Sequence, residues 1–242
     1  MIKGVFFDAH GVLYDRREPT ERYALRLLTE RGYSAELSAV DRTRLRALRD
    51  QATIGRRSPY DYWDAHLAAH GVPKGERAPM VSQILRHADE VIAMPEAAAT
   101  LAALKVRGFL LGVITDTMYP LPVKMGWLAR AGLADYFHVI SCSTALGARK
   151  PDPRIYLDAL ARARLTAAEA AFVGHEAREL EGARRVGMVT VAAFCGPNAT
   201  ADYRVAALPN LLDLPIFRPS PNENHPTRRP TADQQPGTEA TK

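Results

Sequence analysis

Cysteine and long apolar runs are scarce in this chain of 242 residues. Cys142 and Cys195 are the only cysteines, which excludes a disulfide framework and makes a cytoplasmic protein the default expectation. No run approaches the about 18 apolar residues of a membrane-spanning helix. The N-terminal stretch meets an acidic residue at Asp8, too early for a signal peptide. We therefore expect no membrane partner.

Charge of either sign is also modest, with 32 Lys and Arg against 27 Asp and Glu and a net charge of +5. Residues 16–90 hold 14 of the basic and 11 of the acidic residues. Nucleic-acid binders usually show a basic stripe interleaved with aromatic residues, or a recognised fold, and neither is present. We expect no nucleic-acid partner, because a mildly basic face fits the attraction of a small anionic substrate better.

The last 25 residues, 218–242, lack Leu, Ile, Val, Met and aromatic residues and contain five prolines. Such a segment cannot bury enough apolar surface to offset the entropy lost on ordering. We expect it to be a disordered tail.

Short apolar runs of strand length alternate with helical stretches over much of the chain. Near-continuous apolar runs are typical of strands that are covered on both faces. The alternation predicts an α/β core, a doubly wound and mostly parallel Rossmann-like sheet built from residues 1–14 and 92–217. The predicted strands are 2–7, 109–115, 138–141, 170–173 and 189–193, and the predicted helices are 95–107, 122–131, 153–163 and 177–186.

Residues 15–91 contain no run typical of a strand. Helix boundaries recur instead, with Thr20 and Gly32 around one helix and Ser58-Pro59 and Gly71 around another. The segment is too long for a connecting loop. We expect an inserted all-helical domain of about four helices.

Residues with polar or titratable side chains follow the ends of the predicted strands. Ligands bind beyond the carboxyl ends of the strands in open α/β sheets, so these residues should converge on one crevice. They are Asp8 and His10 after the first strand, Thr115 and Asp116 after the second, Lys150 after the third, and His175, Glu176 and Glu179 after the fourth.

This set suits phosphoryl transfer through a covalent intermediate. The Asp8 carboxylate can attack phosphorus and form an acyl phosphate, which water then hydrolyses. Lys150, Thr115 and backbone amides can hold the phosphoryl oxygens, with Asp116 in the same substrate-binding group. His10 is placed to protonate the leaving oxygen.

At these positions the sequence resembles the haloacid dehalogenase superfamily of hydrolases. The family's Asp-x-Asp-x-(Thr/Val) signature corresponds to residues 8–12, its Ser/Thr to Thr115, its lysine to Lys150, and its Gly-Asp-x-x-x-Asp motif to residues 174–179. The resemblance covers about residues 1–217, with the helical insert at the place of a type-one cap. It implies a magnesium-dependent phosphatase of a small metabolite, with the cap selecting the substrate.

Two positions depart from that pattern. His10 stands where the family usually has the acid/base aspartate, and a histidine can still donate and accept a proton. Dehalogenases of the superfamily carry Asp-x-Tyr here, so a 2-haloacid dehalogenase acting through Asp8 is a rival interpretation. A second rival is a catalytically silent relative kept as a binding or regulatory module.

The second departure, His175, stands where relatives place a magnesium-binding aspartate. Imidazole is a poor ligand for Mg²⁺, which prefers oxygen. We expect a weakened Mg²⁺ site that uses Asp8 and Glu179, with His175 and Glu176 as further candidates. The alternatives are Mn²⁺, or no metal because two imidazoles carry the charge.

The main prediction is a phosphomonoester hydrolase with Asp8 as nucleophile and His10 as acid/base. We expect its substrate to be a small phosphorylated metabolite, such as a sugar or cyclitol phosphate in secondary metabolism, and the protein to be a monomer or homodimer. His66 and His70 lie four residues apart, but no suitably spaced third ligand accompanies them. We expect these two histidines on a solvated helix face.

Overall fold

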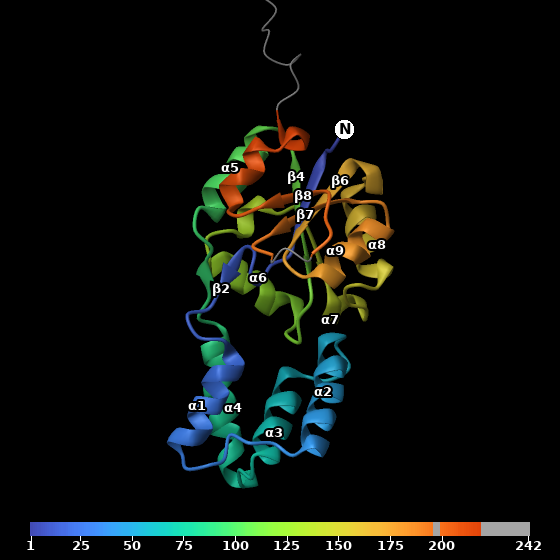
Figure 1. The fold of residues 1–242 in the computed structure, drawn as a ribbon. Helices are drawn as coiled ribbons and strands as arrows, with labels where there is room; N and C mark the ends of the chain where they lie inside the picture. The colour runs from blue at the N-terminus through green and yellow to red at the C-terminus, as the bar shows by residue number, and fades with distance from the viewer. Residues whose placement is uncertain (196–198, 219–242) are drawn as a thin grey trace, which may run out of the picture.

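The computed structural model describes residues 1–195 and 199–218, which form a sheet with flanking helices and a separate bundle of helices (Figure 1). In this described part the main sheet has six strands in the order β5-β4-β1-β6-β7-β8, and all its pairings are parallel. The strands are β1 (Gly4–Phe7), β4 (Leu110–Thr115), β5 (Val139–Cys142), β6 (Ala170–Gly174), β7 (Val189–Ala193) and β8 (Tyr203–Val205). The predicted α/β fold is confirmed.

The apolar strands are buried because helices cover both faces of the sheet. Along β1, Val5 and Phe7 belong to one buried cluster and Phe6 belongs to the other, as alternation along a strand requires. Helices α5 (Ala97–Val106) and α6 (Leu121–Arg130) contribute to the first cluster. Helices α8 (Pro153–Ala163) and α9 (Ala177–Arg185) contribute to the second. Shorter elements are α7 (Ser143–Leu146) and 3-10 turns at Ala134–Tyr136, Ala167–Glu169, Leu208–Asp213 and Pro215–Phe217.

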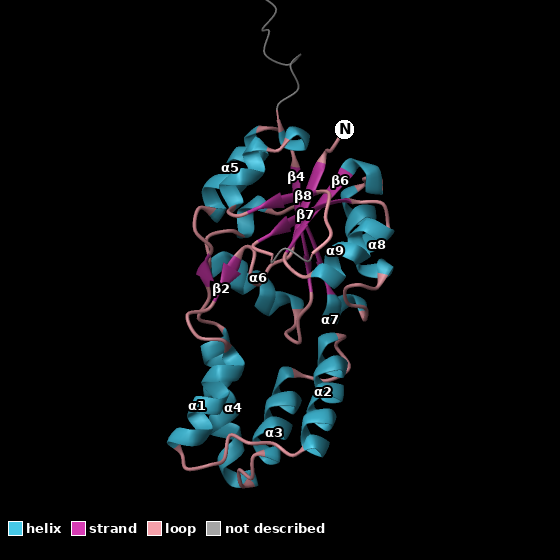
Figure 2. Cartoon of the chain, in the orientation of Figure 1, coloured by secondary structure: helices cyan, strands magenta, loops and turns pink. Residues whose placement is uncertain are grey.

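The predicted helical insert contains four helices, which we call the helical unit. They are α1 (Thr20–Glu30), α2 (Ala39–Thr53), α3 (Pro59–Ala69) and α4 (Lys74–Ala88). The unit is joined to the core through a short antiparallel ribbon of β2 (Tyr14–Asp15) and β3 (Ile92–Ala93) (Figure 2). Its helices share an apolar cluster to which Met118 of the core also belongs. All four helices lie within 15–91, while the division of the chain into two domains stays a prediction. No helix in the described ranges is long and apolar enough to span a membrane. The predicted tail, from residue 219 on, lies outside the described residues.

The expectation for His66 and His70 is wrong, because both are buried in the helical unit. His66 is 7% exposed and His70 is 5% exposed. The His66 ring lies 5.3 Å from that of Trp63 and 4.8 Å from that of His70, between centroids. Neither ring nitrogen of His66 has a hydrogen-bond partner among the described residues. Burial, with a smaller contribution from His70, lowers the pKa of His66 to about 4.

We expect the helical unit to lose stability in acid through His66. Its pKa is near 6.5 in an unfolded chain, so the unfolded state binds a proton first as the pH falls. The contribution of neutral His66 to the free energy of unfolding is complete above about pH 6.5. It falls by about 3 kcal/mol as the pH is lowered to about 4. Urea unfolding across this range should show the loss in the native protein and a smaller one in His66→Leu. The matched control His138→Gln, at an exposed histidine, should behave as wild type. An acid limb unchanged in His66→Leu would contradict this assignment.

Candidate active site

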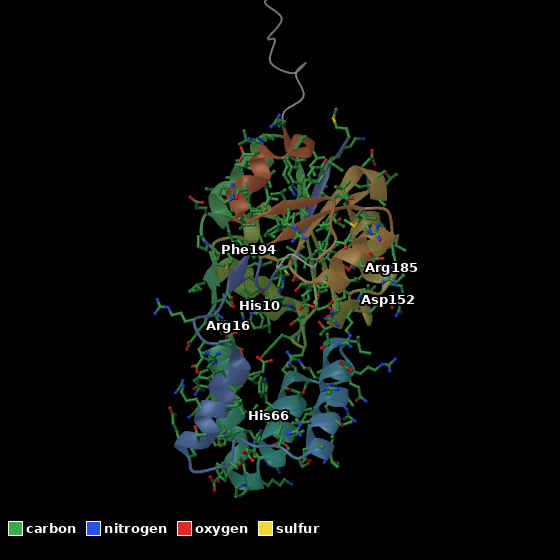
Figure 3. The ribbon with its side chains drawn as sticks, in the orientation of Figure 1. His10, Arg16, His66, Asp152, Arg185 and Phe194 are labelled. Atoms are coloured by element: carbon green, nitrogen blue, oxygen red, sulfur yellow. The ribbon has the colours of Figure 1, made fainter. Side chains whose placement is uncertain are left out.

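A cavity of about 550 Å³ lies where the carboxyl ends of β1, β4 and β6 face the helical unit. Figure 3 shows His10 and Arg16 at this junction, with His66 inside the helical unit. The sheet core contributes Asp8, His10, Asp116, Lys124, Lys150, His175, Glu176, Arg178 and Glu179, and the helical unit contributes Glu21, Arg46, Arg49, Asp50 and Trp63. The structure thus brings most of the predicted site residues into one cavity.

Asp8 lies at its floor, directly after β1, and is 6% exposed. Its Oδ1 accepts hydrogen bonds from Lys150 Nζ at 2.7 Å and from the Ala9 amide at 2.8 Å. Its Oδ2 lies 3.2 Å from His175 Nδ1. Burial by itself would raise the pKa of Asp8, but the charge of Lys150 and the contact with His175 outweigh it and hold the pKa far below its usual range. Asp8 is therefore a fixed, ionised carboxylate.

Lys150 is completely buried and lies between two carboxylates. Its Nζ is 2.7 Å from Asp8 Oδ1 and 2.8 Å from Glu179 Oε2. Its backbone amide donates to Asp116 Oδ1 at 3.0 Å, which fixes the loop that carries it. Burial alone would lower the pKa of Lys150, but Asp8 and Glu179 raise it well above its usual range. The lysine is therefore a permanent cation beside the Asp8 carboxylate.

Glu179, on the first turn of α9, is 3% exposed. Burial raises its pKa to about 7, against the opposing charge of Lys150, and the nearby Asp8 adds to the increase. Glu176 is different, since its half-exposed side chain pairs with Arg178 at 2.9 Å. Of the two glutamates, Glu179 is therefore the one held close to Asp8 and Lys150.

His175 fills the space beside the free oxygen of Asp8. A Cβ built at Gly11, where φ is +76°, would come within 3.1 Å of His175 Nε2, so the missing side chain gives the ring its place. The contact with Asp8 raises the pKa of His175, against the effect of burial. The Asp8 carboxylate therefore favours the protonated form of the ring beside it.

These residues do not fit the predicted magnesium ion. The expected ligands Asp8 and Glu179 both contact the Lys150 ammonium, and the second oxygen of Asp8 faces an imidazole nitrogen. Within residues 1–195 and 199–218, no group of three or more His, Cys, Asp or Glu side chains could hold a metal ion. Mg²⁺ needs an oxygen-rich ligand set, and the Lys150 ammonium and the His175 ring occupy the place where one would form.

His10 reaches the cavity, but its ring contacts Asp15 rather than Asp8. Its Nε2 lies 3.2 Å from Asp15 Oδ1, and about half of its side chain (52%) is exposed. Partial burial lowers the pKa of His10, and Asp15 opposes that effect. A histidine held by a carboxylate at the cavity mouth can exchange protons with a bound ligand.

The two predicted residues at the end of β4, Thr115 and Asp116, are placed differently. Thr115 is 1% exposed, its hydroxyl donates to the Asp116 carbonyl at 3.4 Å, and it is not among the described residues that line the cavity. Asp116 lines the cavity but uses Oδ1 to hold the Lys150 amide, and burial raises its pKa. Substrate binding by Thr115 and Asp116 stays a prediction, and the visible role of Asp116 is to position Lys150.

The sequence reasoning missed Lys124, a lysine on α6 that lines the cavity and is 2% exposed. It also missed Tyr14, whose hydroxyl accepts a hydrogen bond from Lys124 Nζ. No motif marks either residue. The one available signal is that Lys124 stands within an otherwise largely apolar helix that follows the second predicted strand.

The chain resembles both phosphatases and dehalogenases. A glyceraldehyde 3-phosphate phosphatase of Methanopyrus kandleri is 31% identical over 198 residues, covering 79% of this chain and 83% of the relative. An (S)-2-haloacid dehalogenase 4A of Burkholderia cepacia is 30% identical over 201 residues, covering 78% and 82%. A dehalogenase crystal structure superposes with a TM-score of 0.66 at 25% identity, covering 88% of this chain and 96% of that one.

The sequence profile of the haloacid dehalogenase-like hydrolases matches residues 2–187, which include β1 with Asp8, the helical unit, Lys150 and Glu179. The chain therefore belongs to the haloacid dehalogenase-like hydrolase family.

Proposed function

We propose that the protein is a phosphomonoester hydrolase that forms an aspartyl phosphate on Asp8. One observation carries the proposal: a buried, ionised carboxylate is held by Lys150 at the floor of a cavity large enough for a small metabolite. Phosphoryl transfer needs little from a protein beyond a positioned nucleophile and fixed positive charge around the phosphoryl oxygens. The Asp8 site supplies both.

In the first step Asp8 Oδ2 attacks phosphorus while Oδ1 stays bound to Lys150 and the Ala9 amide. The bond between phosphorus and the ester oxygen breaks, and His10 gives the leaving oxygen a proton. Water then attacks phosphorus, His10 takes a proton back, and the bond between phosphorus and Oδ2 breaks. Inorganic phosphate and the free Asp8 carboxylate result. We assign His10 to this role because Asp15 holds its ring at the cavity mouth.

We assign to His175 the charge that a divalent cation would supply. The imidazolium is 3.2 Å from Asp8 Oδ2, so a phosphoryl group that arrives at this oxygen meets positive charge on both sides, from His175 and from Lys150. Such preorganised charge counts most in a partly buried site.

The expected consequence is activity that survives chelation. Turnover of wild type should change by no more than about twofold with EDTA, because no oxygen cage for Mg²⁺ is assembled. In His175→Asp the imidazole and its positive charge are replaced by a carboxylate next to Asp8, and this carboxylate can serve as an oxygen ligand for Mg²⁺. This variant should lose at least about tenfold in EDTA and recover with Mg²⁺. Steady-state rates with and without metal check the prediction, with His138→Asp, at an exposed histidine, as control. Wild type silenced by EDTA and rescued by Mg²⁺ would contradict the role of His175.

The substrate that we propose is a small polar alcohol phosphate, of the size of a sugar or cyclitol phosphate. Relatives named glyceraldehyde 3-phosphate phosphatase, phosphoserine phosphatase and phosphoglycolate phosphatase support a small phosphorylated metabolite. We further propose that the helical unit acts as a cap, because Arg46 and Arg49 of α2 line the same cavity as Asp8.

A second candidate is a 2-haloacid dehalogenase. It is favoured by the absence of a metal-binding cluster among the described residues and by the dehalogenases among the relatives. Here Asp8 would displace halide from carbon and form an alkyl ester, and water would cleave that ester at the Asp8 carbonyl carbon. The halide leaves without a proton, so His10 would not be needed as an acid.

One assay separates these candidates from a silent binding module. The protein is treated with EDTA, Mg²⁺ or Mn²⁺ and offered a panel of phosphate monoesters and 2-haloacids, and phosphate and halide are measured. Phosphate from at least one ester supports the proposal. Halide alone assigns the dehalogenase, and silence towards both panels, with ligand-dependent thermal stabilisation, assigns the binding module.

A further inference from the structure

Lys124 is a buried lysine in the active-site cavity that the reaction above does not use. It lies on α6, is 2% exposed and lines the cavity together with Asp8. A lysine is rarely buried without a partner, since removing an ammonium from water is costly. The surroundings of Lys124 therefore indicate what it binds.

Among the described residues, the Lys124 ammonium has a hydrogen-bond acceptor for only one of its N–H groups. Nζ donates one hydrogen bond, to the Tyr14 hydroxyl, and lies 5.0 Å from the ring centroids of both Tyr14 and Trp127. No carboxylate within the described ranges lies close enough to form an ion pair with it. An ammonium has three N–H donors, so two remain for a ligand in the cavity.

The charges around Lys124 favour a ligand that brings its own negative charge. Burial lowers the pKa of Lys124 to about 7; Asp8 and Cys142 raise it, and Arg16 and Lys150 lower it. Tyr14, which is bonded to it, has its own pKa raised by burial and stays a neutral phenol. An anion placed on Nζ would stabilise the ammonium and draw a proton onto it.

We propose that Lys124 binds a carboxylate of the substrate, which makes the preferred esters those of small hydroxy acids. This inference rests on the proposed reaction at Asp8 and adds the substrate class. A carboxylate carries one charge and two oxygens, which match the single charge and the two free N–H groups. A second phosphate would need more positive charge beside Lys124, and Arg16, whose charge acts on Lys124, is engaged: its Nε donates to the Ala88 carbonyl at 2.8 Å, and its guanidinium stacks 4.4 Å over Trp127.

The test compares two esters that differ only at the proposed contact. Phosphoglycolate has a carboxylate where 2-hydroxyethyl phosphate has a hydroxymethyl group. Lys124→Met, which keeps the length of the side chain, should raise KM for phosphoglycolate by about 30-fold or more and change kcat little. Turnover of 2-hydroxyethyl phosphate should stay within about threefold of wild type, which also shows that the variant folds. Lys105→Met, at an exposed lysine on α5 that contacts the Asp135 carbonyl, should change neither ester.

Calorimetry measures proton uptake on ligand binding, which would not depend on Lys124 if this lysine only supported the fold. We measure the binding of phosphoglycolate to the Asp8→Asn protein at about pH 8, which is above the pKa of Lys124. Buffers of different ionisation enthalpy then report how many protons are taken up on binding. We expect proton uptake on binding, and clearly less uptake in the Asp8→Asn, Lys124→Met protein.

Equal losses on both esters, or no loss on phosphoglycolate, would overturn the carboxylate contact and leave the phosphatase proposal standing. If neither ester is hydrolysed but phosphoglycolate binds with Lys124-dependent proton uptake, the contact stands, and silence of the whole ester panel as well overturns the phosphatase proposal. Absence of both turnover and binding overturns the contact as well.

Discussion

Asp8→Asn is expected to lower kcat by at least about 10⁴-fold, because an amide oxygen cannot take the place of the attacking carboxylate. The pKa of Asp8 is held far below its usual range, so wild type keeps its nucleophile ionised throughout the neutral and mildly acidic range. Any acidic limb in the rate must then come from another group.

The rates are measured as phosphate release at saturating substrate. The control is Asp135→Asn, at an exposed aspartate that is not among the described residues lining the cavity, and it should retain wild-type rates. Thermal unfolding should show that Asp8→Asn is folded. Retention of more than about a tenth of the activity would remove Asp8 from the chemistry.

Lys150→Met is expected to destabilise the fold as well as remove activity. Asp8 and Glu179 are 6% and 3% exposed and share this one ammonium. Removing one partner of a buried ion pair leaves charge uncompensated and costs about 3–5 kcal/mol of unfolding free energy. We expect the lower end of this range, since Glu179, with a pKa raised to about 7, can take up a proton.

The pH dependence of this loss follows from the same residues. In Lys150→Met both carboxylates have raised pKa values, so the folded state gains protons before the unfolded state as the pH falls. The stability deficit should therefore shrink towards acid pH in urea titrations. Adding Glu179→Gln should recover part of the stability at neutral pH but none of the activity. A deficit that is independent of pH and unaffected by Glu179→Gln would show that Lys150 acts through packing alone.

The fold could be predicted because its strands are continuous apolar runs. Val5, Phe6 and Phe7 are all buried although they face two different clusters, and such a run gives a clear sequence signal. Strand β8 was missed because it is a three-residue edge strand in which Arg204 is exposed. No hydrophobic run distinguishes such a strand from a loop.

The residues of the site that follow strand ends were predictable by the same logic. Asp8 and Lys150 are brought together because parallel strands end at one edge of the sheet. The contact between His175 and Asp8 was not predictable, since it depends on the space left by Gly11. Lys124 was missed and His66 was wrongly expected on a solvated face for one reason: sequence shows residue type, whereas burial of a polar side chain depends on what packs around it.

The most direct test of phosphoryl transfer through Asp8 is a rapid acid quench during turnover, followed by mass spectrometry of the peptide that carries Asp8. The same reaction is run in heavy-oxygen water. We predict a phosphoryl adduct on Asp8, with the heavy oxygen found in the released phosphate and not in the Asp8 carboxylate. An Asp8 carboxylate that gains heavy oxygen, without a phosphoryl adduct, would contradict the account and show attack on carbon instead.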